Sequence, residues 1–147
     1  MMKRFLPLIL IASFSLSSAE QAITQWVYNT LERAQANLDK GNLEAAERIY
    51  YDYANDTWSS RSYDHFVILR TYAYFLISYD RNEEALKYLK QASLKRDMPP
   101  YDIFELNFTL GQVYYVNGDR ENAKKTLLKW VEIGEKNKLD LKPEGYA

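Results

Sequence analysis

Three short stretches of the sequence share one pattern, in which a turn is followed by an acidic helix start and a closing alanine: Gly41-Asn42-Leu43-Glu44-Ala45-Ala46, Asp80-Arg81-Asn82-Glu83-Glu84-Ala85 and Gly118-Asp119-Arg120-Glu121-Asn122-Ala123. Their closing alanines lie 39 and then 38 residues apart. A nearly constant interval of this size is typical of proteins that stack similar supersecondary units. The sequence therefore predicts three similar structural units.

Two further positions recur at fixed distances from each closing alanine. A small residue lies twelve positions earlier and a large apolar residue lies four positions later. The small residues are Ala34, Ala73 and Gly111, and the large residues are Tyr50, Leu89 and Leu127. A small residue on each helix of a hairpin lets the two backbones approach, and a large residue one turn later covers the gap. This spacing predicts helical hairpins.

Apolar residues recur at helical spacing throughout, and polar or proline-containing stretches separate the hairpins. No stretch alternates at period two for long enough to indicate a sheet. We expect helices near 21–39, 42–55, 62–78, 82–94, 101–117 and 120–136. They pair into three antiparallel hairpins at about 22–55, 62–94 and 101–136, which gives an all-α fold over residues 20–136.

The turn, small and large positions resemble those of the tetratricopeptide repeat (TPR), over roughly residues 22–136. The interval departs from the standard 34 residues, and the additional residues lie between hairpins, where insertions cost little. The resemblance implies an α-solenoid of three TPR-like hairpins in a right-handed superhelix that binds protein partners. An unrelated six-helix bundle is the alternative fold.

A narrower resemblance rests on Gln25-Trp26-Val27-Tyr28 and Leu110-Gly111-Gln112-Val113-Tyr114-Tyr115. These segments are similar to periplasmic TPR proteins associated with TonB-type energy-transduction systems, which are longer. Residues 137–147 are expected to form a linker and the start of a further repeat, because Pro143-Glu144-Gly145-Tyr146-Ala147 is similar to the opening of another first helix. The chain is then the N-terminal part of a larger array.

The first 19 residues have the pattern of a secretory signal peptide. Lys3 and Arg4 precede an apolar run, and Ser17 and Ala19 occupy the small positions before a cut at Glu20. The run from Phe5 to Leu16 would be roughly 18 Å long as a helix, against a hydrocarbon core of about 30 Å. We therefore expect cleavage near Ala19-Glu20, no stable membrane insertion afterwards and a periplasmic location. An uncleaved anchor is the alternative.

Composition narrows the chemistry that the chain can offer. Loss of Lys3 and Arg4 with the leader would change the formal net charge from −1 to −3, so nucleic acid is not an expected partner. The chain has no Cys and one His, His65, which we expect at the surface. These residues predict no metal site, no cofactor and no enzyme activity. A hydrolase or lyase on a helical scaffold would need a carboxylate cleft for which the sequence offers no candidate.

The stacked hairpins are expected to expose their first helices along a concave groove that binds a protein or peptide. Counting from the small residues assigns the following residues to this groove: Tyr28, Leu31, Gln35, Leu38, Val67, Arg70, Tyr74, Ile77, Glu105, Phe108, Gln112 and Tyr115. Arg70 is the strongest candidate, because a structural helix has no need of an arginine that faces a groove; the alternative is an ion pair with Glu105 or Glu32. Packing between neighbouring helices is the alternative for the others.

Two functional hypotheses follow. The first is an exported scaffold or adaptor that binds a partner through the concave face, in an envelope complex. The second is a self-assembling helical-repeat domain with no separate ligand. Self-association is expected through Leu128 and Val131 if the chain ends at residue 147, because these residues would then be exposed.

Overall fold

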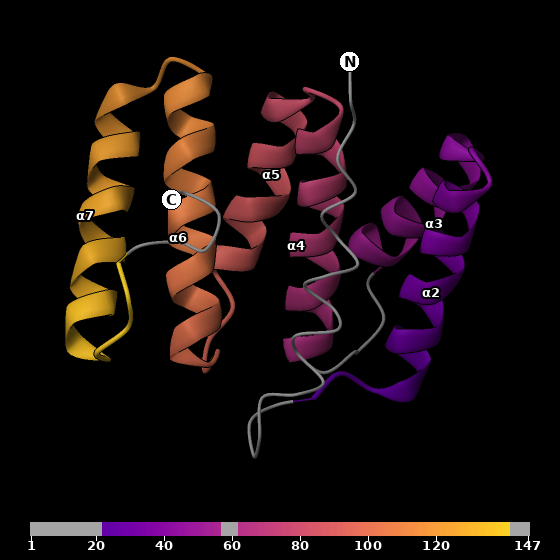
Figure 1. The fold of residues 1–147 in the computed structure, drawn as a ribbon, viewed down its shortest axis with the longest axis horizontal. Helices are drawn as coiled ribbons and strands as arrows, with labels where there is room; N and C mark the ends of the chain where they lie inside the picture. The colour runs from indigo at the N-terminus through magenta and orange to yellow at the C-terminus, as the bar shows by residue number, and fades with distance from the viewer. Residues whose placement is uncertain (1–21, 57–61, 142–147) are drawn as a thin grey trace. The chain divides into compact units, whose positions relative to one another are not determined.

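The computed structural model describes residues 22–56 and 62–141 as six helices, and within these ranges it contains no strand. Figure 1 shows the helices in chain order. They are α2 (Gln25–Asp39), α3 (Leu43–Asn55), α4 (Ser62–Ser78), α5 (Asn82–Ser93), α6 (Pro100–Val116) and α7 (Arg120–Lys136). Consecutive helices pack as pairs, α2 with α3, α4 with α5 and α6 with α7. The predicted all-α helical-repeat fold is confirmed.

Helix starts follow local chemistry: α4, α5 and α7 begin at the predicted residues, α3 and α6 begin within one residue of them, and α2 begins four residues later than predicted. α2 begins at Gln25 because the Thr24 side chain accepts a hydrogen bond from Val27 N at 3.4 Å, which is an N-cap. α6 begins at Pro100, one residue earlier than predicted, because proline fits the first helical position, where no N–H donor is needed.

The three intra-hairpin turns have the same backbone conformation. Gly41, Asp80 and Gly118 have φ values of 79°, 59° and 84°. The amide after each turn residue donates to the carbonyl five positions earlier: Asn42 N to Asn37 O, Arg81 N to Leu76 O and Asp119 N to Tyr114 O, at 2.8, 2.9 and 2.9 Å. This pattern closes each first helix. The turns therefore align the hairpins at the same 39- and 38-residue intervals as the sequence.

The chain divides into two compact units. The first unit extends to Arg96 and contains α2–α5, and the second begins at Asp97 and contains α6 and α7.

The three closing alanines, Ala46, Ala85 and Ala123, are buried, as their role in hairpin packing requires.

In the first unit one hairpin stacks on the next through aromatic rings. Tyr50 of α3 is fully buried, and its ring centroid lies 6.0 Å from that of Tyr72 and 5.4 Å from that of Phe75, both in α4. Tyr72 in turn lies 4.6 Å from Tyr88 of α5. Offset and tilted rings at these distances contribute packing energy beyond their buried area. Helix α4 therefore packs against α3 and α5 at once.

In the second unit close packing rests on glycine. A Cβ atom at Gly111 would lie 2.6 Å from Leu127 Cδ2. At Gly134 a Cβ would lie 2.9 Å from Phe104 Cε2 and 2.5 Å from Leu141 Cδ2. Gly111 and Leu127 occupy the small and large positions identified in the sequence, so the expected packing of the third hairpin is present.

Two predicted segments lie wholly or partly outside the described residues. The signal peptide at 1–19 and its cut at Ala19-Glu20 are outside them, as is the segment Pro143–Ala147 expected to start another repeat. None of the helices in 22–56 and 62–141 is both long and apolar enough to span a membrane.

Candidate protein-binding groove

Several residues assigned to the concave groove are buried, which corrects the prediction that they face solvent. Leu31, Val67 and Arg70 are buried in the first unit, and so are Gln35 and Leu38. In this arrangement they offer almost no surface to a partner. Their role in binding stays a prediction that would require the unit to open.

Arg70 shows why the expectation of exposure was wrong. Its side chain is 1% exposed, and its guanidinium carbon lies 5.2 Å from the centroid of the Phe66 ring. A guanidinium over an aromatic face is a cation–π contact, and the long alkyl stem adds apolar packing. Since α4 contacts α2, α3 and α5, its residues are buried on nearly every side. The sequence assigned Arg70 to a face but could not show that other helices cover that face.

Polar residues of α2 make contacts within their own helix. Gln35 Nε2 donates to Asp39 Oδ1 at 2.8 Å, so this amide is engaged locally. Tyr28 is 38% exposed, and a hydrogen bond with Glu32 raises the pKa of its phenol. A carboxylate that accepts from the phenol stabilises the neutral form of the tyrosine.

The remaining predicted residues reach solvent to different degrees. Tyr74, Ile77, Glu105, Phe108 and Gln112 are half-buried, and Glu105 Oε1 accepts a hydrogen bond from the Tyr101 hydroxyl at 2.9 Å. Tyr115 is 62% exposed. Of the predicted residues, Phe108 and Tyr115 lie together along one groove.

This groove lies between α6 and α7 and encloses about 590 Å³. Its lining residues are Phe108, Tyr115, Arg120, Ala123, Lys124, Leu127, Leu128, Trp130 and Val131. Most of them belong to α7, whereas sequence reasoning placed binding on the first helix of each hairpin. The exposed stripe at Leu128 and Val131 was the sequence signal that could have located it.

An aromatic cluster stiffens the groove. The Trp130 ring lies 4.9 Å from the Phe108 ring and 5.4 Å from the Phe104 ring, measured between centroids. These tilted and stacked contacts hold α6 against α7 at the side of the groove. Leu128, which is 59% exposed, and Tyr115 leave apolar surface open to solvent.

The charges of the groove have one sign. Arg120 and Lys124 line it, and no carboxylate from the described part of the chain does. Neither cation has an ion-pair partner among the described residues, whereas the neighbouring Lys125 pairs with Glu121 at 3.7 Å. An apolar groove with unpaired cations favours an apolar ligand that also has a negative charge.

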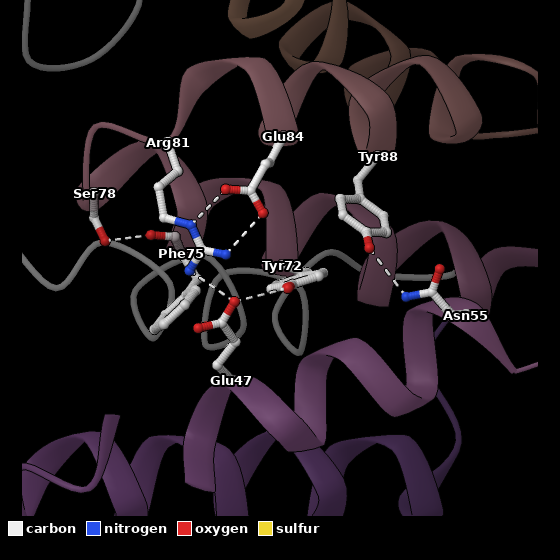
Figure 2. Close-up of polar contacts among 8 residues, drawn as sticks. All are labelled: Glu47, Asn55, Tyr72, Phe75, Ser78, Arg81, Glu84 and Tyr88. Atoms are coloured by element: carbon white, nitrogen blue, oxygen red, sulfur yellow. Dashed lines mark hydrogen bonds and ion pairs between the residues drawn. The ribbon is translucent and has the colours of Figure 1, made fainter. Parts of the chain in front are cut away.

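The first unit shows how a comparable surface is covered (Figure 2). Glu47 of α3 accepts from the Tyr72 hydroxyl at 3.0 Å and pairs with Arg81 at 2.7 Å. Arg81 also makes two contacts of 2.8 Å with Glu84, which lowers the pKa of that carboxyl. Asn55 at the end of α3 donates to the Tyr88 hydroxyl of α5 at 3.0 Å. Polar and aromatic contacts therefore hold the second hairpin on the first.

His65 is half-buried rather than at the surface. Its Nε2 lies 3.0 Å from Ala54 O, so the carbonyl accepts from a protonated Nε2. Burial lowers the pKa of the imidazole, and the bond to Ala54 only partly opposes this effect. Within 22–56 and 62–141 there is no group of His, Cys, Asp or Glu side chains that could hold a metal ion.

Comparison with known proteins gives one distant similarity. The chain is 29% identical over 118 residues to pre-mRNA-splicing factor 6 of Saccharomyces cerevisiae, a match that covers 73% of this chain and 11% of that protein. The chain thus matches about a tenth of the length of this relative. No protein-family model matches the chain, and no solved structure matches it significantly. With six helices packed in consecutive pairs, the chain is a helical-repeat protein.

Proposed function

We propose that this protein is a scaffold or adaptor that binds a protein or peptide partner, and that the partner occupies the groove on α6 and α7. The observation that supports this proposal is an apolar groove with exposed Tyr115 and Leu128 at its surface and two cations in its lining, Arg120 and Lys124, neither of which has an ion-pair partner among the described residues. Exposed aromatic and leucine side chains that converge on one groove are typical anchors for a helical peptide.

The concave face remains a second part of the proposed binding surface. Of the residues assigned to it, the following reach solvent: Tyr28, Tyr74 and Ile77 in the first unit, and Glu105, Phe108, Gln112 and Tyr115 in the second. The proposal involves binding only and assigns no catalytic residue.

We also propose export to a periplasm and work in an envelope complex. The support is the sequence of residues 1–19. Lys3 and Arg4 precede an apolar run, and the small residues Ser17 and Ala19 lie just before the expected cleavage site at Glu20. Mass spectrometry of the protein isolated from the envelope and cytoplasmic fractions tests this. A mature N-terminus at Glu20 in the periplasmic fraction is expected, and an intact Met1 terminus in the cytoplasm would contradict it.

Photocrosslinking tests binding at the groove. A photoreactive residue is placed at Leu128 in the groove or, as a control, at Leu94, which is 80% exposed in the first unit. We expect a defined crosslinked partner from position 128 only, and its loss when Tyr115→Ala is added. Equal crosslinking from both positions, or none from position 128, would refute the groove assignment.

Self-assembly is the second candidate, because Leu128 is exposed and Val131 lies beside it in the groove. Light scattering separates the two functions. A concentration-dependent dimer or polymer that Leu128→Lys abolishes would support self-assembly. A monomer at all concentrations, together with a crosslink to another protein, would support the scaffold.

A further inference from the structure

The floor of the groove on α6 and α7 corresponds to a surface that is covered in the first unit, whereas Tyr51 and Leu43, which correspond to the lining residues Leu128 and Arg120, are 51% and 37% exposed there. The turns at Gly41, Asp80 and Gly118 share one conformation, and they align the first hairpin with the third. In this alignment Leu31 corresponds to Phe108, Leu38 to Tyr115, Tyr50 to Leu127 and Ala54 to Val131. All four residues of the first hairpin are buried. The floor of the groove is therefore equivalent to a hairpin-stacking surface.

The first unit also shows what such a surface accepts. Helix α4 lies against α3 and presents Tyr72 and Phe75, three residues apart, to the buried ring of Tyr50. Arg81 then pairs with Glu47 at the edge of the contact, at 2.7 Å. Arg81 lies beyond the end of α4, at the N-cap of α5 and nine residues after Tyr72. An occupant of this kind of surface is an amphipathic helix with two large apolar residues on one face and a charged residue just after its C-terminal end.

The charge at the edge is reversed in the third hairpin. The residue that corresponds to Glu47 is Lys124, and the residue that corresponds to Leu43 is Arg120. Both are cations of the groove without an ion-pair partner in the described ranges. A partner with an arginine in the position of Arg81 would be repelled here, and one with a carboxylate would be attracted.

We infer that the groove binds an amphipathic helix of a partner protein that has two aromatic side chains three residues apart on one face and an acidic residue just after its C-terminal end. This inference rests on the proposed function, because it gives the chemistry of the partner at the same groove. Apolar anchors give the affinity, and the carboxylate near Lys124 selects the partner.

A second copy of the chain does not have this chemistry in the matching helix. In α2 the residues that correspond to Tyr72 and Phe75 are Arg33 and Ala36, and both are exposed. A second copy docked through α2 would place a cation and a small side chain against Lys124 and the apolar floor. Like charges and a missing anchor disfavour this arrangement.

Two fluorescein-labelled synthetic helices test the inference by fluorescence anisotropy with the full chain. Both contain Tyr and Phe three residues apart on one face. One has two Glu residues and the other two Lys residues at the C-terminal end, eight and nine residues after the Tyr. We expect the Glu helix to bind about fivefold more tightly, the factor that corresponds to about 1 kcal/mol for one partly screened charge pair.

Matched variants identify the groove as the site. Lys124→Glu should reverse the preference toward the Lys helix, whereas Lys129→Glu, an exposed residue of α7 outside the groove, should leave it unchanged. Leu128→Lys should weaken both helices. Circular dichroism of each variant confirms that it remains folded.

Each other outcome overturns the inference in a distinguishable way. Equal binding of both helices, or a preference that Lys124→Glu does not change, would show that the groove does not select for acidic residues, although it could still be a binding site. If neither helix binds while position 128 still crosslinks to a partner, the partner is not an amphipathic helix of this kind, and the proposed scaffold function is unaffected. Loss of both binding and crosslinking refutes the proposed function as well. A dimer that Leu128→Lys dissociates would show that a second copy is the occupant.

Discussion

Position 118 shows how one residue ends a helix. Gly118 has φ of 84°, where a side chain is strained, and a Cβ there would meet nothing within 4 Å. The cost of a side chain at this position therefore comes from the backbone conformation and not from a steric clash. We expect Gly118→Ala to lower the free energy of unfolding by about 1 kcal/mol, as measured by urea denaturation. Asp80→Gly, at the equivalent turn with φ of 59°, should be neutral or slightly stabilising. A change of the same sign in both variants would contradict this account.

His65 predicts a pH dependence at the residue scale. Because burial holds its pKa below the ordinary value of 6.5, the unfolded chain binds a proton more readily than the folded chain. The free energy of unfolding is then unaffected by His65 above pH 6.5, and it falls as the pH drops below 6.5 toward the lower folded pKa. Stability is thus lost on the acid side.

Replacement of His65 isolates this effect. Gln keeps a donor near Ala54 O but does not titrate, so His65→Gln should lose less stability than the wild type between pH 7 and pH 5. Urea denaturation at several pH values measures the difference, in which the carboxylates common to both proteins cancel. Parallel pH profiles would show that His65 has the same proton affinity in both states.

At the scale of the element, the helices were predictable because local signals mark both ends. Gly41 and Gly118 allow the positive φ of two turns, and Pro100 suits the first position of a helix. After each turn, acidic residues lie in the first turn of the next helix, where the helix dipole favours them. Predicted and observed boundaries differ by about one residue at most described ends. These signals act within a few residues and need no knowledge of distant contacts.

The candidate site was less predictable, because accessibility depends on which elements cover a face. Periodicity assigned Arg70 to an open face of α4, but three helices contact α4 and Arg70 is buried. Conversely, the sequence analysis assigned Leu128 only to self-association and assigned no role to Lys124, whereas the structure places both of them beside Phe108 in one groove. Helical spacing shows which way a side chain points, whereas its exposure depends on which other helices pack against that face.

The contact between α3 and the start of α5 can be measured as a coupling between two side chains. Glu47 and Arg81 are 29% and 35% exposed and lie 2.7 Å apart. A double-mutant cycle with Glu47→Gln and Arg81→Gln should give a coupling of about 0.5–1 kcal/mol, discounted for partial screening by solvent.

An exposed pair provides the control for this cycle. Glu44 and Arg48, at 3.2 Å, are 91% and 70% exposed, so Glu44→Gln and Arg48→Gln should couple by no more than about 0.3 kcal/mol. Both cycles use urea denaturation at low and high salt. Equal couplings for the two pairs would show that the contact of Glu47 adds nothing beyond a surface ion pair.

At the scale of the whole molecule, repeat proteins are stabilised within each repeat and across each interface between neighbours. In the first unit the interface centres on Tyr50, which belongs to one hairpin and packs on Tyr72 and Phe75 of the next. The two hairpins of this unit should therefore unfold together. Loss of the Tyr50 ring would weaken both.

Tyr50→Ala tests this cooperativity. Removal of a fully buried ring should cost about 3–5 kcal/mol and lower hydrogen-exchange protection in α4 and α5 as well as in α2 and α3. Tyr50→Phe keeps the ring and should lose much less. Tyr51→Ala, at a neighbouring residue that is 51% exposed, should change stability by less than about 0.5 kcal/mol. Protection lost only in α2 and α3 would mean that each hairpin is stable without its neighbour, and the stacking surface proposed for α6 and α7 would then lose its structural precedent.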